Sequence, residues 1–149
     1  MEKVKYNSED ILNHHGIAAV IKNEKGEILM QEHVKYGFWT IPVGKVKIGQ
    51  SVKEGLKQEI LEECNIFIEK SKQLKTKKYI YNRNGNEVEV LQHLFEIIKY
   101  RGKIKNNEPN KHKQQKFLSL NKIKNLSYLS DCTILYLKVL GFERQAYHF

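Results

Sequence analysis

Three glutamates, Glu59, Glu62 and Glu63, stand at positions i, i+3 and i+4 of one segment. On a helix this spacing places the three carboxylates on one face, where each like-charged neighbour costs about 0.2–0.5 kcal/mol. The chain carries 26 lysines and arginines, yet none of them stands three or four positions from any of these glutamates. The missing counter-charge predicts a bound metal ion.

Carboxylate oxygens are hard ligands that suit Mg²⁺ or Mn²⁺, and these ions commonly bridge to the phosphates of a substrate. A metal held in this way activates water and neutralises charge on phosphoryl oxygens, so the expected substrate is a phosphate compound. Zinc is not favoured, because His14 and His15 are adjacent and His33, His93, His112 and His148 are isolated. The alternative interpretation of the three glutamates is the solvated face of an amphipathic helix.

A helix over residues 52–64 must position these carboxylates. Ser51 and Glu54 form the S-x-x-E capping pattern, and apolar residues then recur at helical spacing. A second helix is predicted over residues 131–140, with Gly141 as its C-terminal cap. The expected fold class is therefore α/β once the strands are added.

The strand signals lie on both sides of the first helix. An apolar run at 16–21, a turn at 23–26 and the segment 27–31 predict a hairpin. Asn84-Gly85 predicts a second hairpin between 78–81 and 87–100. The remaining segments are expected to be a loop over 32–41 that reaches the site, an exposed basic loop over 101–116, and a short strand over 117–120.

Length, charge and cysteine content set the wider expectations. The 149 residues suit one domain, 1–149, with a core at about 16–141. The net charge of +9 is expected to aid solubility and to attract anions weakly. RNA contact by the basic stretch 103–116 is the alternative. Cys64 and Cys132 lack CxxC spacing, and no apolar stretch suits a signal peptide or a membrane span, so a cytoplasmic location without membrane contact is expected.

The segment around the glutamates resembles the Nudix box, G-x5-E-x7-R-E-U-x-E-E-x-G-U, in which U is a bulky aliphatic residue. The positions that match the box are Gly44, Glu59, Ile60, Glu62, Glu63 and Ile66. Three positions depart from it, because Gln50 replaces a glutamate, Gln58 an arginine and Asn65 a glycine. The segment Trp39-Thr40-Ile41-Pro42 resembles the approach to the box, and the resemblance covers about residues 16–141.

The resemblance implies a Nudix-type α/β/α sandwich with a mixed central sheet, and Mg²⁺-dependent hydrolysis of a nucleoside diphosphate linked to another group. Carried over by position, Glu59, Glu62 and Glu63 bind the divalent ions, and one of them orients or deprotonates the attacking water. Gly44 lets the loop backbone approach the metal, with the Val43 carbonyl as a candidate ligand. The candidates for a further acid are Glu89, Glu96 and Glu108.

Substrate contacts are expected from Trp39, by stacking on a base, and from Lys45 with its neighbour Lys47, on phosphate. The alternatives are packing for the tryptophan and plain solvation for the lysines. Neutral Gln58 lacks the charge with which an arginine would pair with Glu62, and we expect its amide to hydrogen-bond to Gln50 instead.

Two function classes follow from this resemblance. The first is a metal-dependent pyrophosphohydrolase of nucleotides, with 5′-end RNA hydrolysis as a variant. The second is a catalytically weakened domain that binds nucleotide or RNA.

Overall fold

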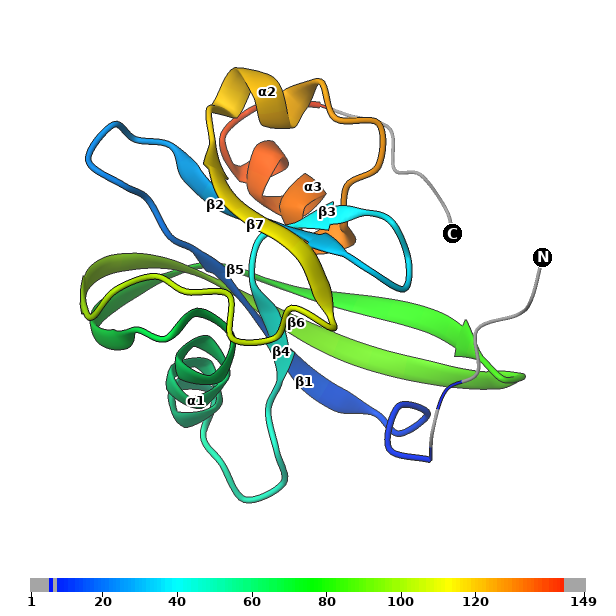
Figure 1. Ribbon diagram of the computed structural model, residues 1–149. Coiled ribbons are helices and arrows are strands. Elements are labelled where there is room, and N and C mark those ends of the chain that lie inside the picture. Colours follow the sequence, from blue (N-terminus) through cyan, green and yellow to red (C-terminus); the bar gives the residue numbers. More distant parts are fainter. Residues whose placement is uncertain (1–5, 7, 144–149) are drawn as a thin grey trace.

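The computed structural model describes Tyr6 and residues 8–143. Its strands are β1 (His14–Val20), β2 (Ile28–His33), β3 (Trp39–Thr40), β4 (Val43–Lys45), β5 (Phe67–Arg83), β6 (Asn86–Arg101) and β7 (His112–Leu118). Its helices are α1 (Val52–Cys64), α2 (Leu120–Lys124) and α3 (Asp131–Val139). The strands occupy the middle of the molecule, with α1 on one side and α2 and α3 on the other (Figure 1).

The strands form two sheets. The larger sheet has the order β4-β1-β6-β5, in which β1 is parallel to β6 while β4 and β5 join antiparallel. The smaller sheet has the order β3-β2-β7 and is antiparallel throughout. The predicted α/β class with a mixed central sheet and helices on both sides is thus confirmed.

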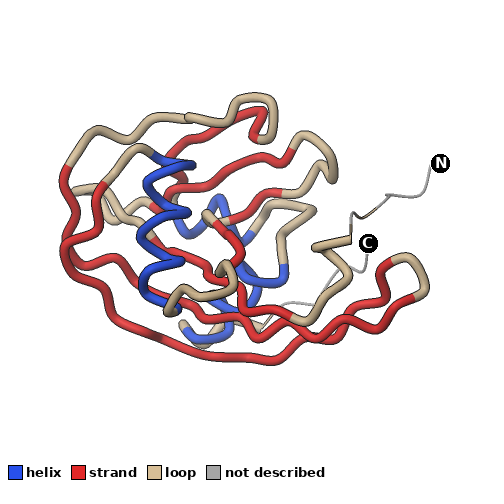
Figure 2. Tube along the Cα trace, turned by 90° about the horizontal axis from the view of Figure 1, so that it is seen from below, coloured by secondary structure: helices blue, strands red, loops and turns tan. Residues whose placement is uncertain are grey.

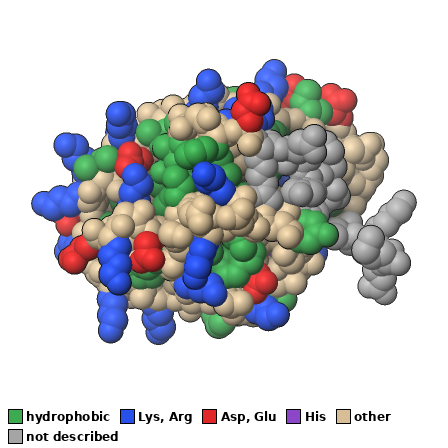
Figure 3. All heavy atoms as spheres, turned by 90° about the horizontal axis from the view of Figure 1, so that it is seen from above, with side chains coloured by type: hydrophobic (Ala, Val, Ile, Leu, Met, Phe, Trp, Pro, Cys, Tyr) green, Lys and Arg blue, Asp and Glu red, His purple; other side chains and the backbone are tan. Residues whose placement is uncertain are grey.

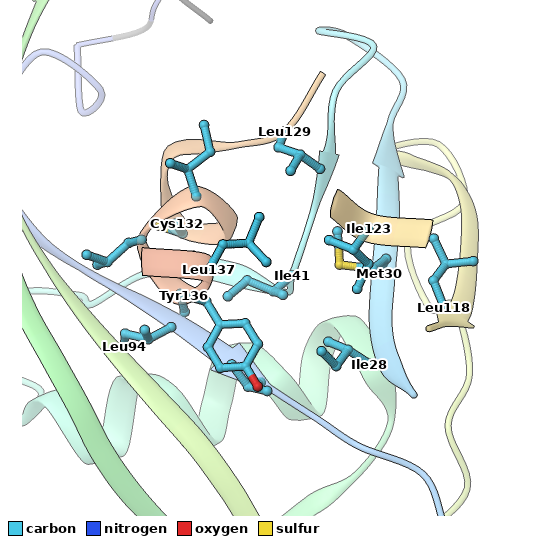
Figure 4. Packing of buried hydrophobic residues seen from close by; sticks show 14 residues of the cluster. Ile28, Met30, Ile41, Leu94, Leu118, Ile123, Leu129, Cys132, Tyr136 and Leu137 are labelled. Atoms are coloured by element: carbon cyan, nitrogen blue, oxygen red, sulfur yellow. The ribbon is translucent and has the colours of Figure 1, made fainter. Parts of the chain in front are cut away.

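Two apolar clusters cover the two faces of β1. Ile17 packs with Ile60 of α1 and Phe95 of β6, and α1 lies over the strands on this side of the molecule (Figure 2). Ala18 packs with Leu94 in the other cluster, which includes α3 (Figure 4). Since successive side chains of a strand point to opposite faces, an apolar run such as β1 is buried on both.

The helix α1 begins and ends where the sequence predicts. Ser51 accepts a hydrogen bond from the amide of Glu54, whose side chain in turn accepts one from the Ser51 amide, which completes the capping box. Asn65 then adopts the left-handed conformation, with φ 64° and ψ 29°. Asparagine tolerates this conformation, so Asn65 stands in place of the glycine of the Nudix-box pattern without breaking the cap.

The predicted hairpin at Asn84-Gly85 is also confirmed, and its strands are longer than expected because β5 begins at Phe67. The hairpin predicted for 16–21 and 27–31 is wrong in its pairing. The turn forms, with a bridge between Lys22 and Ile28, but β1 and β2 then enter different sheets.

Other segments differ from their predictions. Residues 112–116 lie in β7, not in an exposed loop, because they pair with β2. Likewise β2 extends to His33 and β3 forms at Trp39, so only the middle of 32–41 is a loop. The expected strand at 117–120 ends at Leu118, where the Ser119 hydroxyl caps the unpredicted helix α2.

Lysine and arginine side chains are spread over the face of the molecule drawn in Figure 3. They alternate there with acidic, apolar and neutral side chains, which agrees with reading the net charge of +9 as a general property of the surface. Within the described residues, every helix is too short or too polar to cross a membrane.

We predict that Ile60→Ala lowers the free energy of unfolding by about 2–5 kcal/mol, because it empties space between α1 and the larger sheet. The Ile60 side chain is 0% exposed, whereas Ile48 in the loop before α1 is 101% exposed. The matched variant Ile48→Ala should therefore change this free energy by less than about 0.5 kcal/mol. Urea unfolding measures both, and similar losses for the two variants would contradict this packing.

Candidate functional site

Glu63, in the last turn of α1, is the buried glutamate of the three, with a side chain 1% exposed. Its Oε1 accepts a hydrogen bond of 3.3 Å from Gln31 Nε2 and lies 3.6 Å from His112 Nε2. In the part of the chain that the structure describes, its Oε2 is buried without a hydrogen-bond partner. Because an unsatisfied buried acceptor costs about 1–3 kcal/mol, this oxygen marks a place for a ligand.

The polar segment 105–112 is bound to the end of α1. The amides of Lys105 and Asn107 donate to the carbonyls of Cys64 and Glu63, at 3.0 and 3.2 Å. Carbonyls in the last turn of a helix have no partner within the helix, so they are free to hold such a segment. The segment is therefore ordered beside Glu63 although its composition is that of a solvated loop.

Asn106 gives this segment its shape. Its Oδ1 accepts a hydrogen bond from the amide of Glu108 at 3.2 Å, and its Nδ2 donates to the carbonyl of His112 at 2.9 Å. As a result, one ligand atom each from Glu63, Glu108 and His112 lie within 4.8 Å of one another. We call these three residues the buried triad, in which Glu63 and His112 are buried and Glu108 is partly exposed.

Burial sets the protonation of Glu63 and His112. It raises the pKa of Glu63 to about 8 and lowers the pKa of His112 to about 4, the second with help from the positive charge of Lys111. Near neutral pH their contact is therefore between an uncharged acid and a neutral imidazole. Because a divalent cation stabilises ionised carboxylates, its binding would release a proton here.

Glu59 lies against Gly44 of β4. A Cβ placed on Gly44 would come within 2.4 Å of the Glu59 Cγ, a separation that real Cβ atoms do not show. The glycine therefore allows β4 to approach the carboxylate-bearing face of α1. Burial first, and then the charge of Glu62, raise the pKa of Glu59, while the positive charges of Lys111 and Lys47 oppose this rise.

Glu62 is exposed and is held by a chain of amides. The backbone amide of Lys47 donates to Gln50 Oε1 at 2.9 Å, and Gln50 Nε2 donates to Gln58 Oε1. Gln58 Nε2 then donates to Glu62 Oε1 at 2.9 Å. The predicted amide pair is confirmed. Gln58 also hydrogen-bonds to Glu62, although it lacks the charge with which an arginine would pair with that glutamate.

The other predicted site residues have different neighbours. Lys45 Nζ donates to the carbonyl of Glu9 at 2.8 Å and lies 3.6 Å from Asp10 Oδ1. Trp39 is half-buried against the cluster that includes α3, with Lys116 Nζ 5.4 Å from its ring centroid. Their roles in substrate binding stay predictions.

Of the three candidates for a further acid, Glu108 is the one that joins Glu63. Glu89 and Glu96 are instead paired with Lys78 and Lys22, at 3.8 and 3.1 Å.

Sequence reasoning missed His112 and Gln31. Treating His112 as isolated was wrong, because chain folding brings it to Glu63. The available signal was the E-x3-H spacing from Glu108 to His112 behind Asn106, whose side chain suits a tight turn.

The donors at this site fit a divalent cation. Carboxylate oxygens from α1 and from segment 105–112 converge with an imidazole, and one buried oxygen lacks a partner. Among the described residues, no lysine or arginine nitrogen lies within 4.0 Å of a carboxylate oxygen of Glu59, Glu62 or Glu63. Lys111 and Lys47 act on Glu59 only at longer range, so no direct ion pair with a lysine or arginine neutralises this acidic face in the described residues.

Comparison with known proteins agrees with this geometry. The family profile of the NUDIX domain matches residues 12–132, which is most of the chain. The chain therefore belongs to the Nudix family.

Solved structures of the family share the fold. A MutT NUDIX hydrolase from Burkholderia pseudomallei matches with a TM-score of 0.71 at 24% identity, over 86% of this chain and 98% of that one. A MutT protein from Methanosarcina mazei Go1 matches with a TM-score of 0.68 at 25% identity, over 81% and 87%. A Danio rerio relative, 8-oxo-dGDP phosphatase NUDT18, is 40% identical over 53 residues, which is 34% of this chain but 16% of that protein.

We predict that Gly44→Ala lowers the free energy of unfolding by about 1–3 kcal/mol, because the added methyl group overlaps the Glu59 side chain. In a Glu59→Gly background the methyl group has room, so the same substitution should cost less than about 0.5 kcal/mol. Urea unfolding of the four proteins in this double-mutant cycle measures the difference. Equal costs in both backgrounds would show that Glu59 does not require the glycine.

Proposed function

We propose that this chain is a divalent-cation-dependent hydrolase that cleaves a phosphoanhydride bond. Its substrate would be a nucleoside di- or triphosphate or a nucleoside diphosphate derivative. The observation that carries this proposal is the buried Glu63 Oε2, which has no hydrogen-bond partner among the described residues and belongs to the buried triad. Bound Mg²⁺ or Mn²⁺ would supply charge neutralisation on phosphate oxygens and a more acidic water.

The glutamates of α1 would divide the remaining work. Glu59, Glu62 and Glu63 would hold the cations, and one of them would orient or deprotonate the attacking water. The raised pKa of Glu59 brings that carboxyl closer to neutral pH, where a general base is most effective. Gly44 would admit the β4 backbone, including the Val43 carbonyl, to the same site.

Residues other than the three glutamates would hold the substrate. In this proposal Lys45 contacts phosphate and Trp39 stacks on the base, as their residue types suggest. The zebrafish relative is named for a nucleoside diphosphate, 8-oxo-dGDP, which supports the nucleotide class. Cys64 and Cys132 are free and buried, which supports a reducing, cytoplasmic setting.

A domain that only binds nucleotide or RNA was the second candidate, because Gln50 and Gln58 are neutral. Their hydrogen bonds to each other and to Glu62 favour the enzyme. They restrain a proposed ligand and so supply the positioning that a charged pair would otherwise give.

We predict that Glu63→Gln lowers Mg²⁺-dependent turnover by at least about 100-fold, because the variant cannot supply an ionised oxygen to the cation. Glu62→Gln should also lower Mg²⁺-dependent turnover. The measurement is release of phosphate or pyrophosphate from a panel of nucleotides and nucleoside diphosphate derivatives, with Mg²⁺ and with EDTA.

Glu87→Gln is the matched control, because Glu87 is exposed at the β5–β6 hairpin. This variant should keep wild-type turnover. Turnover that persists in EDTA and in Glu63→Gln would reject the proposal, whereas tight nucleotide binding without turnover by the wild type would support the second candidate.

A further inference from the structure

We propose that His112 is a nitrogen ligand of the divalent cation, and that it gives the site a preference for transition-metal ions such as Co²⁺ over Mg²⁺. This inference rests on the proposed function, because it concerns the same cation. It adds to the Nudix box a residue that stands 49 positions after Glu63 in the chain.

The burial and partners of the His112 ring point to a ligand. The side chain is 1% exposed, and in the part of the chain that the structure describes its Nδ1 has no hydrogen-bond partner. Its Nε2 lies 3.3 Å from Gln31 Nε2 and 3.6 Å from Glu63 Oε1. A buried histidine with a purely structural role is expected to satisfy its polar atoms, and this one does not.

The backbone of His112 is held in place on both sides. Its amide donates to the carbonyl of Glu108 at 2.8 Å, and its carbonyl accepts a hydrogen bond from Asn106 at 2.9 Å. The ring meets His33 edge-on, with 6.1 Å between centroids. The position of the imidazole beside Glu63 is therefore built into the fold.

Gln31 acts as a positioning residue for Glu63. Its Nε2 donates to Glu63 Oε1 at 3.3 Å and also lies 3.3 Å from His112 Nε2, where it can only donate, so coordination through this ring nitrogen would displace the Gln31 amide. Its Oε1 accepts a hydrogen bond from Gln115 Nε2 at 2.9 Å, which fixes the direction of that amide. Outer partners of this kind are common around metal sites.

The chemical types of the ligand atoms decide whether the site prefers Co²⁺ or Mg²⁺. Mg²⁺ takes oxygen ligands and gains little from an imidazole, whereas the first-row transition metals bind imidazole well. Two carboxylates alone would leave Mg²⁺ competitive. An added nitrogen from His112 should strengthen the binding of Co²⁺ much more than that of Mg²⁺.

The test compares binding of Co²⁺ and Mg²⁺ to the full chain by calorimetry in wild type, His112→Asn and His33→Asn. His33 is the matched control, because it lies on β2 next to His112 but outside the buried triad. We expect His112→Asn to weaken Co²⁺ binding by about tenfold or more and Mg²⁺ binding by less than about threefold. His33→Asn should change neither.

A second measurement does not depend on the variant's folding. In the proton NMR spectrum of the Co²⁺-loaded wild type, a paramagnetically shifted imidazole resonance is expected. Its absence, or equal effects of His112→Asn on the two metals, would overturn the inference. If Mg²⁺-dependent hydrolysis is observed but neither the shifted resonance nor the Co²⁺-selective effect of His112→Asn is found, the proposed function stands without this ligand. If neither metal binds the wild type, both are rejected.

Discussion

The structure depends on a carboxyl group, that of Glu63, buried at the end of α1 beside a histidine but with no ion pair to a lysine or arginine among the described residues. Removing such a group from water costs several kcal/mol unless a charge or hydrogen bonds compensate, and for Glu63 the compensation is partial. Other features are arranged around this group. The helix is capped at Ser51 and Asn65, β4 approaches it at a glycine, and segment 105–112 is tied to its last carbonyls.

Local signals in the sequence were enough for α1 and for the long hairpin. The capping box of Ser51 and Glu54 and the left-handed Asn65 act within a few residues of the chain, so they hold in any fold. The Asn84-Gly85 turn is also a local signal, which joins β5 and β6 in the long hairpin. The acidic face followed from the helical spacing of the three glutamates. The pairing of Gln50 with Gln58 and the mixed sheet followed from the resemblance to the Nudix box, because that resemblance assigns a role to each sequence position.

The remaining part of the site depends on contacts between distant segments. Strand β7 reads HKQQKFL, and its inward-facing positions include His112 and Gln115, which serve the site and not the apolar core. The alternation of apolar and polar residues that marks a strand is therefore missing. The prediction that β1 pairs with β2 was wrong for a related reason. A well-formed turn between two strands does not decide which sheet the second strand joins.

The most direct test of the central claim is urea unfolding of the wild type and Glu63→Gln at pH 8, in EDTA and in saturating Mn²⁺. In EDTA the wild type should be no more stable than the variant. In the folded wild type the pKa of Glu63 is raised from 4.5 to about 8. As pH rises through this range the unfolded chain loses the Glu63 proton before the folded chain does, so the free energy of unfolding falls. Mn²⁺ at about 100 times its Kd should add about 2.7 kcal/mol to the wild type and far less to the variant. Equal gains in both proteins, or a clear loss of stability by Glu63→Gln in EDTA, would contradict the account.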